Sequence, residues 1–337
     1  MRRLYDLELE RVADEIRTRR AGRVLIQLPD GLRPLAFEIA ESLRKETVAE
    51  IILSGDSCYG GCDPASRQAE AIGADLIVHY GHSRMIKDPG IPVIYVEARI
   101  SIDAEALVEA AAPNLGGWRR VGLATTVQHV HQLGEVAEAL RRRGFTPLIG
   151  GGDDVTPYDG QVLGCHYSAA TSLPEEADGY LFIGGGTFHP IGLALTTGKP
   201  VVTANPYNAT VSLLGEAELM TLAKKRMAAI TIAKAAKRVG VLVSLKPGQF
   251  NPALSGLVEK YETRGISAFL IYLDEVRADA LNNFSEVDAF VDTACPRIAL
   301  DGVAGVERPI LTAPEAMVAL GELSWGEVWG GRLLSTG

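Results

Sequence analysis

Short apolar runs return along the chain in a fixed order, and each run ends in a polar turn. Three of them share a basic residue before a continuous apolar strand: GRVLIQLPDG (22–31), RRVGLATTVQ (119–128) and KRVGVLVSLK (237–246). Each is followed by a stretch with the apolar spacing of a helix, at 33–45, about 131–143 and 252–264. A further strand follows each helix, at 50–55, 145–151 and 267–273. The pattern therefore predicts three copies of one β-α-β unit.

The second half of each unit repeats as well. The third strands begin with an acidic residue and end in a distinctive loop: ADLIVHYGHS (74–83), ADGYLFIGGG (177–186) and VDAFVDTACP (287–296). A proline opens each short fourth strand, at 92–98, 200–206 and 309–315. Two α/β units often resemble each other by chance, but four strands in register three times favour a repeat. Continuous apolar strands of this kind are typical of buried parallel sheets.

We therefore predict an α/β fold of three Rossmann-like units with parallel sheets, arranged around a pseudo-threefold axis. The predicted domains are residues 1–110, 111–211 and 212–337, and the third begins with a long helical connector at 212–237. Ligands of open α/β sheets bind beyond the carboxyl ends of the strands. Three units around such an axis would point those ends at one central site.

The four cysteines follow predicted strand ends. Cys58 and Cys62 come after the second strand of the first unit. Cys165 follows the second strand of the second unit, and Cys295 follows the third strand of the third unit. A single cysteine is more often a small buried apolar residue, but one in a loop of every unit favours a shared site. Three thiolates suit an iron–sulfur cluster with one exchangeable iron. Four suit structural zinc, which usually uses C-x-x-C pairs that this sequence lacks.

The loop SGDSCYGGCDPA (54–65) leaves one question open. Its spacing begins the C-x-x-x-C-x-x-C cluster loop of ordinary radical enzymes that use S-adenosylmethionine, but Ala65 stands at the third position. The residues alone do not decide whether Cys58 or Cys62 joins the shared site. Gly60, Gly61 and Gly164 flank the cysteines, which indicates that the backbone approaches a bulky group closely.

Composition narrows the classes of function. The chain has 337 residues and a net charge of −9, and its longest basic run is Arg141–Arg143, so we expect no direct nucleic-acid binding. The charged N-terminal segment lacks the apolar core of a signal peptide, and no apolar stretch reaches the length of a membrane span. We therefore expect a cytoplasmic protein with no membrane partner, whose cysteines are thiols or metal ligands.

Six segments together carry a family resemblance: GDSCYGGCD (55–63), HYGHS (79–83), GQVLGC (160–165), GGGTFHPIGL (184–193), KPGQ (246–249) and DTACPRIALD (292–301). They resemble those of the archaeal diphthamide-synthesis enzymes, the 2-(3-amino-3-carboxypropyl)histidine synthases, and the resemblance extends over all three units. It implies a homodimer of triplicated α/β protomers and a 4Fe–4S cluster held by one cysteine of each domain. By position it implies Cys62, Cys165 and Cys295 as ligands and leaves Cys58 outside the site, because the family keeps tyrosine, glycine, a small residue and cysteine in that order.

The same resemblance implies the reaction. S-adenosylmethionine would lose its 3-amino-3-carboxypropyl arm as a radical, which adds to the imidazole C2 of one histidine in translation elongation factor 2. The by-product would be 5′-methylthioadenosine, and the step is the first of diphthamide biosynthesis. The free iron of the cluster would bind the co-substrate and deliver an electron, while the protein supplies orientation and electrostatics. The electron donor is not indicated by the sequence.

Loops at the strand ends supply candidate S-adenosylmethionine contacts. Arg297 could grip a carboxylate, although an interdomain ion pair with Asp301 is an equal alternative. The KPGQ segment could equally be a turn that opens a helix, and His82, like His189, is more often structural than functional. The complete set of candidate contacts is Gln249, Lys246, Arg297, Asp301, Gly185, Thr187 and His82.

Two other functions remain possible at this point. Quinolinate synthase has a similar triplicated design and a three-cysteine cluster, but its cluster acts as a Lewis acid in a dehydration. The second alternative is a non-catalytic α/β scaffold whose units are held together by a bound metal. The KPGQ and ACPRIA segments favour the diphthamide enzyme over quinolinate synthase.

Overall fold

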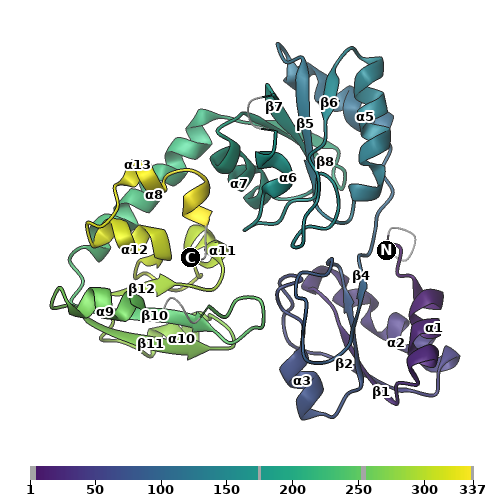
Figure 1. Ribbon diagram of the computed structural model, residues 1–337, viewed down its shortest axis with the longest axis horizontal. Coiled ribbons are helices and arrows are strands. Elements are labelled where there is room, and N and C mark those ends of the chain that lie inside the picture. The colour runs from purple at the N-terminus through teal and green to yellow at the C-terminus, as the bar shows by residue number, and fades with distance from the viewer. Residues whose placement is uncertain (1–4, 174–175, 252–255, 335–337) are drawn as a thin grey trace.

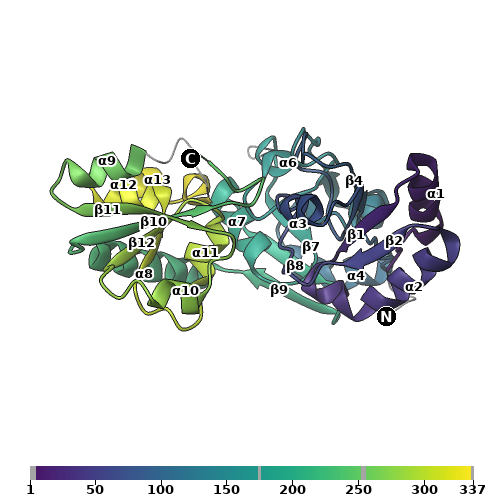
Figure 2. The same ribbon diagram turned by 90° about the horizontal axis from the view of Figure 1, so that it is seen from below.

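The computed structural model describes residues 5–173, 176–251 and 256–334, which form three lobes in a triangular arrangement (Figure 1). Turned by 90°, the third lobe lies at one end of the molecule and the first at the other (Figure 2). Each lobe contains one sheet, and in every sheet the first strand lies between the second and the third. The predicted fold class and the threefold repeat of parallel strands are thereby confirmed.

The first sheet has the order β2-β1-β3-β4 and is parallel throughout. Its strands are β1 (Arg23–Gln27), β2 (Glu50–Leu53), β3 (Leu76–Tyr80) and β4 (Val93–Val96). Its helices are α1 (Leu9–Arg19), η1 (Asp30–Leu35), α2 (Ala36–Glu46) and α3 (Ser66–Ala71). Helix α1 was not predicted, because its sequence is mostly charged. Its narrow apolar face, Val12, Ala13 and Ile16, is buried in the core of this lobe.

The second sheet has the order β6-β5-β7-β8-β9. Its strands are β5 (Arg120–Thr125), β6 (Thr146–Leu148), β7 (Gly179–Ile183), β8 (Val201–Asn205) and β9 (Thr210–Leu214). Its helices are α4 (Ala104–Ala111), η2 (Ala112–Leu115), η3 (Val130–Gln132), α5 (Leu133–Arg142), α6 (Ser168–Thr171) and α7 (Phe188–Thr197). Strand β9 is antiparallel to β8, which makes this sheet mixed rather than parallel.

The third sheet has the order β11-β10-β12-β13 and is again parallel. Its strands are β10 (Arg238–Ser244), β11 (Ser267–Leu273), β12 (Ala289–Asp292) and β13 (Ile310–Thr312). Its helices are α8 (Glu216–Ala233), α9 (Gly256–Glu262), α10 (Ala278–Asn282), α11 (Pro296–Asp301), α12 (Ala313–Ala319), α13 (Trp325–Val328) and η5 (Gly331–Leu334). The start of the helix predicted at 252–264 lies outside the described residues.

Strand β9 changes the picture of the predicted connector. Residues 212–214 belong to this strand, and the helix starts only at Glu216. A turn after β8, in which the side chain of Asn205 accepts a hydrogen bond from the backbone N–H of Tyr207, returns the chain as a hairpin. The second sheet therefore extends past residue 211, where the boundary between the second and third domains was expected.

An aspartate before the third strand has the same structural role in every unit. Asp75 precedes β3, and its carboxylate accepts the backbone N–H groups of Gly22 and Arg23, both at 2.8 Å. Asp178 and Asp288 form the same pair of bonds at 2.7–2.9 Å in the second and third units. These bonds lower the pKa of both carboxyls. Each aspartate thus ties strand three to the start of strand one, at the sheet edge opposite the strand carboxyl ends.

Helix α8 is fastened to the third domain by a buried ion pair. The guanidinium of Arg226 donates to the Glu315 carboxylate at 2.7 and 2.5 Å, and their side chains are 3% and 0% exposed. Arg226 also donates to the carbonyl oxygens of Ala299 and Ile310. No described helix is long and apolar enough to cross a membrane.

Candidate functional site

Cysteines of all three domains line one cavity of about 210 Å³. Cys62 lies in the loop after β2, and Cys295 opens α11 three residues after β12 ends. Cys165 reaches the cavity because a parallel bridge between Thr125 and Gln161 aligns its segment with the end of β5. The strand ends of the three sheets therefore meet at one place, as the repeat predicted.

The environment of these thiols favours the neutral form. Desolvation raises the pKa of Cys62. Desolvation and the nearby Cys62 sulfur raise the pKa of Cys165 to about 11. The pKa of Cys295 rises to about 12 for the same main reason, with contributions from Asp292 and the other two cysteines. The three sulfurs are close enough to influence one another, and a bound cation would have to displace their protons.

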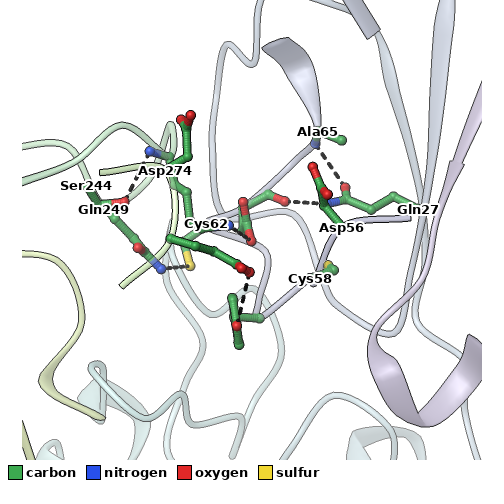
Figure 3. Close-up of polar contacts among 12 residues, drawn as sticks. Gln27, Asp56, Cys58, Cys62, Ala65, Ser244, Gln249 and Asp274 are labelled. Atoms are coloured by element: carbon green, nitrogen blue, oxygen red, sulfur yellow. Dashed lines mark hydrogen bonds and ion pairs between the residues drawn. The ribbon is translucent and has the colours of Figure 1, made fainter. Parts of the chain in front are cut away.

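The third domain holds the Cys62 loop in place. The backbone N–H of Gly248 donates to the carbonyl oxygen of Cys62 at 2.8 Å, and a Cβ on Gly248 would lie 2.7 Å from the Cys62 Cα. The side-chain amide of Gln249 donates to the Cys62 Sγ at 3.6 Å (Figure 3). On the other side, Gly61 leaves no room for a Cβ against the carbonyl oxygen of Ser83. The glycines thus allow close approach between protein segments.

An ion pair also holds the Cys62 loop against the third domain. Lys246 Nζ lies 2.6 Å from Asp63 Oδ2, and the two side chains are 14% and 8% exposed. The ammonium also lies 5.2 Å from the centre of the Tyr59 ring, and the Tyr59 hydroxyl donates to Glu275. Asp63 and Tyr59 were not predicted from the sequence, although each is next to a cysteine in the same loop. Lys246, expected at S-adenosylmethionine, is engaged with a protein carboxylate.

A second cavity, of about 380 Å³, adjoins the first. The two share Tyr59, Cys62, Cys295 and Arg297. Four of the candidate contacts to S-adenosylmethionine line the second cavity: Lys246, Gln249, Arg297 and Asp301. His82 lines the three-cysteine cavity, whereas Gly185 and Thr187 are not among the residues that line either one. The structure therefore gathers five of the seven candidates around the cysteines.

Arg297 takes part in two contacts. Its guanidinium lies 2.9 Å from the Asp301 carboxylate, and both residues belong to α11. The ion pair considered from the sequence therefore exists, but it lies within one helix and does not join two domains. The interdomain contact is with Phe188 of α7, whose ring centre is 4.9 Å from the guanidinium carbon. Phe188 also packs on Gly164, which has no room for a Cβ.

Two neutral histidines lie in the cavity wall. Burial lowers the pKa of His82 to about 4, and burial together with Arg297 lowers the pKa of His189 to about 4. His189 stacks on the Phe182 ring at 5.8 Å between ring centres. The loop around His82 is fixed by the second domain, because Gln161 donates to the Ser83 hydroxyl at 2.7 Å.

Cys58 lies apart from the other three cysteines. It is 5% exposed and does not line the three-cysteine cavity. Its sulfur is 3.8 Å from His79 Nε2 and 3.9 Å from His82 Nδ1. Figure 3 shows Cys58 on the Gln27 side of the loop and the Cys62 sulfur facing Gln249. His79 was not singled out from the sequence, although two histidines three apart at a strand end were a usable signal.

Comparisons with known proteins agree with this arrangement. A family model for diphthamide synthesis proteins matches residues 28–330. The 2-(3-amino-3-carboxypropyl)histidine synthase of Pyrococcus horikoshii is 39% identical over 97% of this chain and 95% of that protein. Subunit 1 of the Homo sapiens synthase is 29% identical over 95% of this chain and 73% of that subunit. The crystal structure of Dph2 from Pyrococcus horikoshii with a 4Fe–4S cluster has a TM-score of 0.87 at 37% identity, covering 97% of this chain and 95% of that chain.

Proposed function

The chain belongs to the diphthamide synthesis protein family, and on this premise we propose that it is a 2-(3-amino-3-carboxypropyl)histidine synthase. It is then a transferase that moves the 3-amino-3-carboxypropyl group of S-adenosylmethionine to a histidine of translation elongation factor 2, in the first step of diphthamide biosynthesis. Relatives of this name cover nearly the whole chain, which leaves no domain unmatched. The three-cysteine cavity is the observation that carries the proposal.

Cys62, Cys165 and Cys295 are the proposed ligands of a 4Fe–4S cluster. One thiol from each domain is the donor set that such a cluster with one open iron requires. When bound, the cluster supplies a Lewis-acidic iron and an electron for cleavage of the sulfonium. The chain's own residues hold the three sulfurs at the domain junction. Through Gln249 they also supply a hydrogen bond to one of those sulfurs.

The adjoining cavity is the proposed place of S-adenosylmethionine. Arg297 offers a fork of N–H donors to the methionine carboxylate. Asp301 pairs with Arg297 within α11, so it would have to share the guanidinium with the substrate or release it. Gln249 has polar atoms on the same cavity, whereas Lys246 acts there mainly by holding Asp63 and the Cys62 loop. Gly185 and Thr187 receive no support from the cavity linings.

Anaerobic incubation with reductant, S-adenosylmethionine and elongation factor 2 tests the proposal. The S-adenosylmethionine carries one isotope in the aminocarboxypropyl arm and another in the S-methyl group. We expect the first label on a single histidine and the second in 5′-methylthioadenosine. Formation of 5′-deoxyadenosine with no protein labelling would contradict the proposal.

Two controls separate the alternative functions. Production of quinolinate from iminoaspartate and dihydroxyacetone phosphate would show that the protein is a dehydratase and not the proposed transferase. Absence of any iron-dependent absorbance near ~400 nm after anaerobic reconstitution would favour a non-catalytic scaffold.

A homodimer and a cytoplasmic location remain predictions. A sedimentation experiment on the reconstituted protein tests whether it is a homodimer.

A further inference from the structure

Cys58, His79 and His82 form a compact group of sulfur and nitrogen donors beside the three-cysteine cavity. Their donor atoms all lie within 4.8 Å of one another. The two sulfur–nitrogen distances are 3.8 and 3.9 Å, and His79 Nε2 lies 2.9 Å from His82 Nδ1. The group joins the loop after β2 to the end of β3, so it lies entirely within the first domain. None of its three donors is among the proposed cluster ligands.

Gln27 determines which nitrogen of His79 is free to act as a donor to a metal. Two hydrogen bonds fix the orientation of the Gln27 amide: its Nε2 donates to the Asp63 carbonyl oxygen, and its Oε1 accepts from the Ala65 backbone N–H. The same Oε1 lies 2.8 Å from His79 Nδ1, so that nitrogen must carry the proton. His79 Nε2 therefore presents its lone pair to Cys58 and His82. Histidine ligands of metals are typically oriented by such a hydrogen bond from the other ring nitrogen.

We propose that Cys58 Sγ, His79 Nε2 and His82 Nδ1 form a second metal site, which binds one Zn²⁺ beside the three-cysteine cavity through donors other than its three sulfurs. Tetrahedral Zn²⁺ with bonds of about 2.3 Å to sulfur and about 2.0 Å to nitrogen separates sulfur from nitrogen by about 3.5 Å and the two nitrogens by about 3.3 Å. The observed separations differ from these by a few tenths of an ångström. One thiolate and two imidazoles are donors that Zn²⁺ accepts readily, and the fourth position is left for water.

Binding exchanges protons for the ion. The Cys58 thiol loses its proton to solvent when its sulfur bonds to Zn²⁺, and both histidines bind as neutral rings. The competing arrangement is a closed set of hydrogen bonds, in which His79 Nε2 accepts a hydrogen bond from the Cys58 thiol or from His82 Nδ1–H and no ion binds.

The test uses Co²⁺ as a spectroscopic probe in the full chain with Cys62, Cys165 and Cys295 all replaced by alanine. We expect one tightly held Co²⁺ per chain, with tetrahedral ligand-field bands and charge transfer from a single thiolate. Adding Cys58→Ala should abolish this spectrum, whereas His131→Gln, a histidine outside the group, should leave it unchanged. Absence of the spectrum in a variant that remains folded overturns the proposal.

A second measurement covers the case in which the triple variant does not fold. The anaerobically reconstituted wild-type protein is exposed to Zn²⁺, desalted and analysed for iron and zinc together. We expect about one zinc per chain beside the cluster iron, with zinc absorption fine structure showing one sulfur at ~2.3 Å and two nitrogens at ~2.0 Å. Cys58→Ala should remove the zinc and keep the iron. Zinc that Cys58→Ala does not remove, or zinc surrounded by three sulfurs, contradicts the proposal without bearing on the transferase activity.

Discussion

Cys58 and Cys62 lie four positions apart in one loop, but they face different parts of the molecule. Cys58 contacts His79 and His82 of its own domain, behind which Gln27 anchors the loop. Cys62 faces the junction of the three domains and is held by Gln249 and Gly248 of the third. The contacts of the Cys58 sulfur therefore come from the first domain, although Gln161 of the second domain holds the neighbouring Ser83, whereas the contacts of Cys62 include residues of the third domain.

The cores explain why this difference matters. Among the described residues, one buried core spans the second and third domains, with Tyr167 and Phe182 of one and Val239 and Leu311 of the other. The core of the first domain consists of residues of that domain alone. Its contact with the third domain includes ion pairs and hydrogen bonds such as Lys246–Asp63, Arg67–Asp274 and Tyr59–Glu275. The Cys62 side thus depends on polar contacts that single substitutions can remove.

The largest expected effect is a difference in cluster iron between variants of Cys62 and of Cys58. Cys62→Ala, Cys165→Ala and Cys295→Ala should each lose most of the cluster iron, because each removes one of the three proposed ligands that line the cavity. Cys58→Ala should retain it. Iron and sulfide analysis of anaerobically reconstituted variants, with the ~400 nm absorbance, measures the difference. The assignment is reversed if Cys58→Ala strips the iron and Cys62→Ala spares it.

The next effect concerns the ion pair that holds the Cys62 loop. Lys246→Met leaves the Asp63 carboxylate without its partner in a site that is 8% exposed. Removing one member of a buried pair typically costs about 3–5 kcal/mol, so we expect a lower unfolding midpoint in urea. The matched control is Lys87→Met, whose pair with Asp154 joins the first two domains at 75% and 80% exposure. Such an exposed pair should contribute less than about 1 kcal/mol.

The double variant Lys246→Met/Asp63→Asn sharpens this result. Removing the carboxylate charge as well should recover part of the lost stability, because no unpaired charge remains at the contact. Equal midpoints for Lys246→Met and Lys87→Met would show that the Lys246–Asp63 pair does not stabilise the contact between the domains.

A smaller effect is expected from steric crowding of the Cys62 loop. Gly248→Ala would place a Cβ 2.7 Å from the Cα of Cys62, so the loop must move. Overpacking of this kind costs about 1–3 kcal/mol, and we expect weaker cluster retention under chelator challenge. Gly134→Ala in α5 is the control, because nothing lies within 4 Å of the added atom. Alanine there should leave cluster retention unchanged, and equal iron loss in both variants would contradict the steric argument.

More of the fold than of the site could be predicted from the sequence. The succession of strands along the chain could be predicted, because each strand is a short apolar run and the same runs return in every unit. The three cysteines could be found because one follows a strand end in every unit. The role of Lys246 could not be found, because its partner is 183 positions away and is set by domain packing. Strand β9 was missed for a different reason: it pairs locally with β8, but none of its five residues is fully buried, so no buried apolar run marks it as a strand.

The smallest expected effect is electronic and concerns Gln249. Its amide donates to the Cys62 Sγ at 3.6 Å, and such a bond stabilises the added negative charge of a reduced cluster. Gln249→Leu keeps much of the side-chain volume but removes the donor, so the potential should fall. A hydrogen bond contributes about 1 kcal/mol, which corresponds to roughly 40 mV for a one-electron couple. A redox titration followed by electron paramagnetic resonance measures the shift, and Phe250→Leu, at the exposed neighbouring position, is the control. An unchanged potential in Gln249→Leu with full cluster occupancy would mean that the third domain holds Cys62 through its backbone alone.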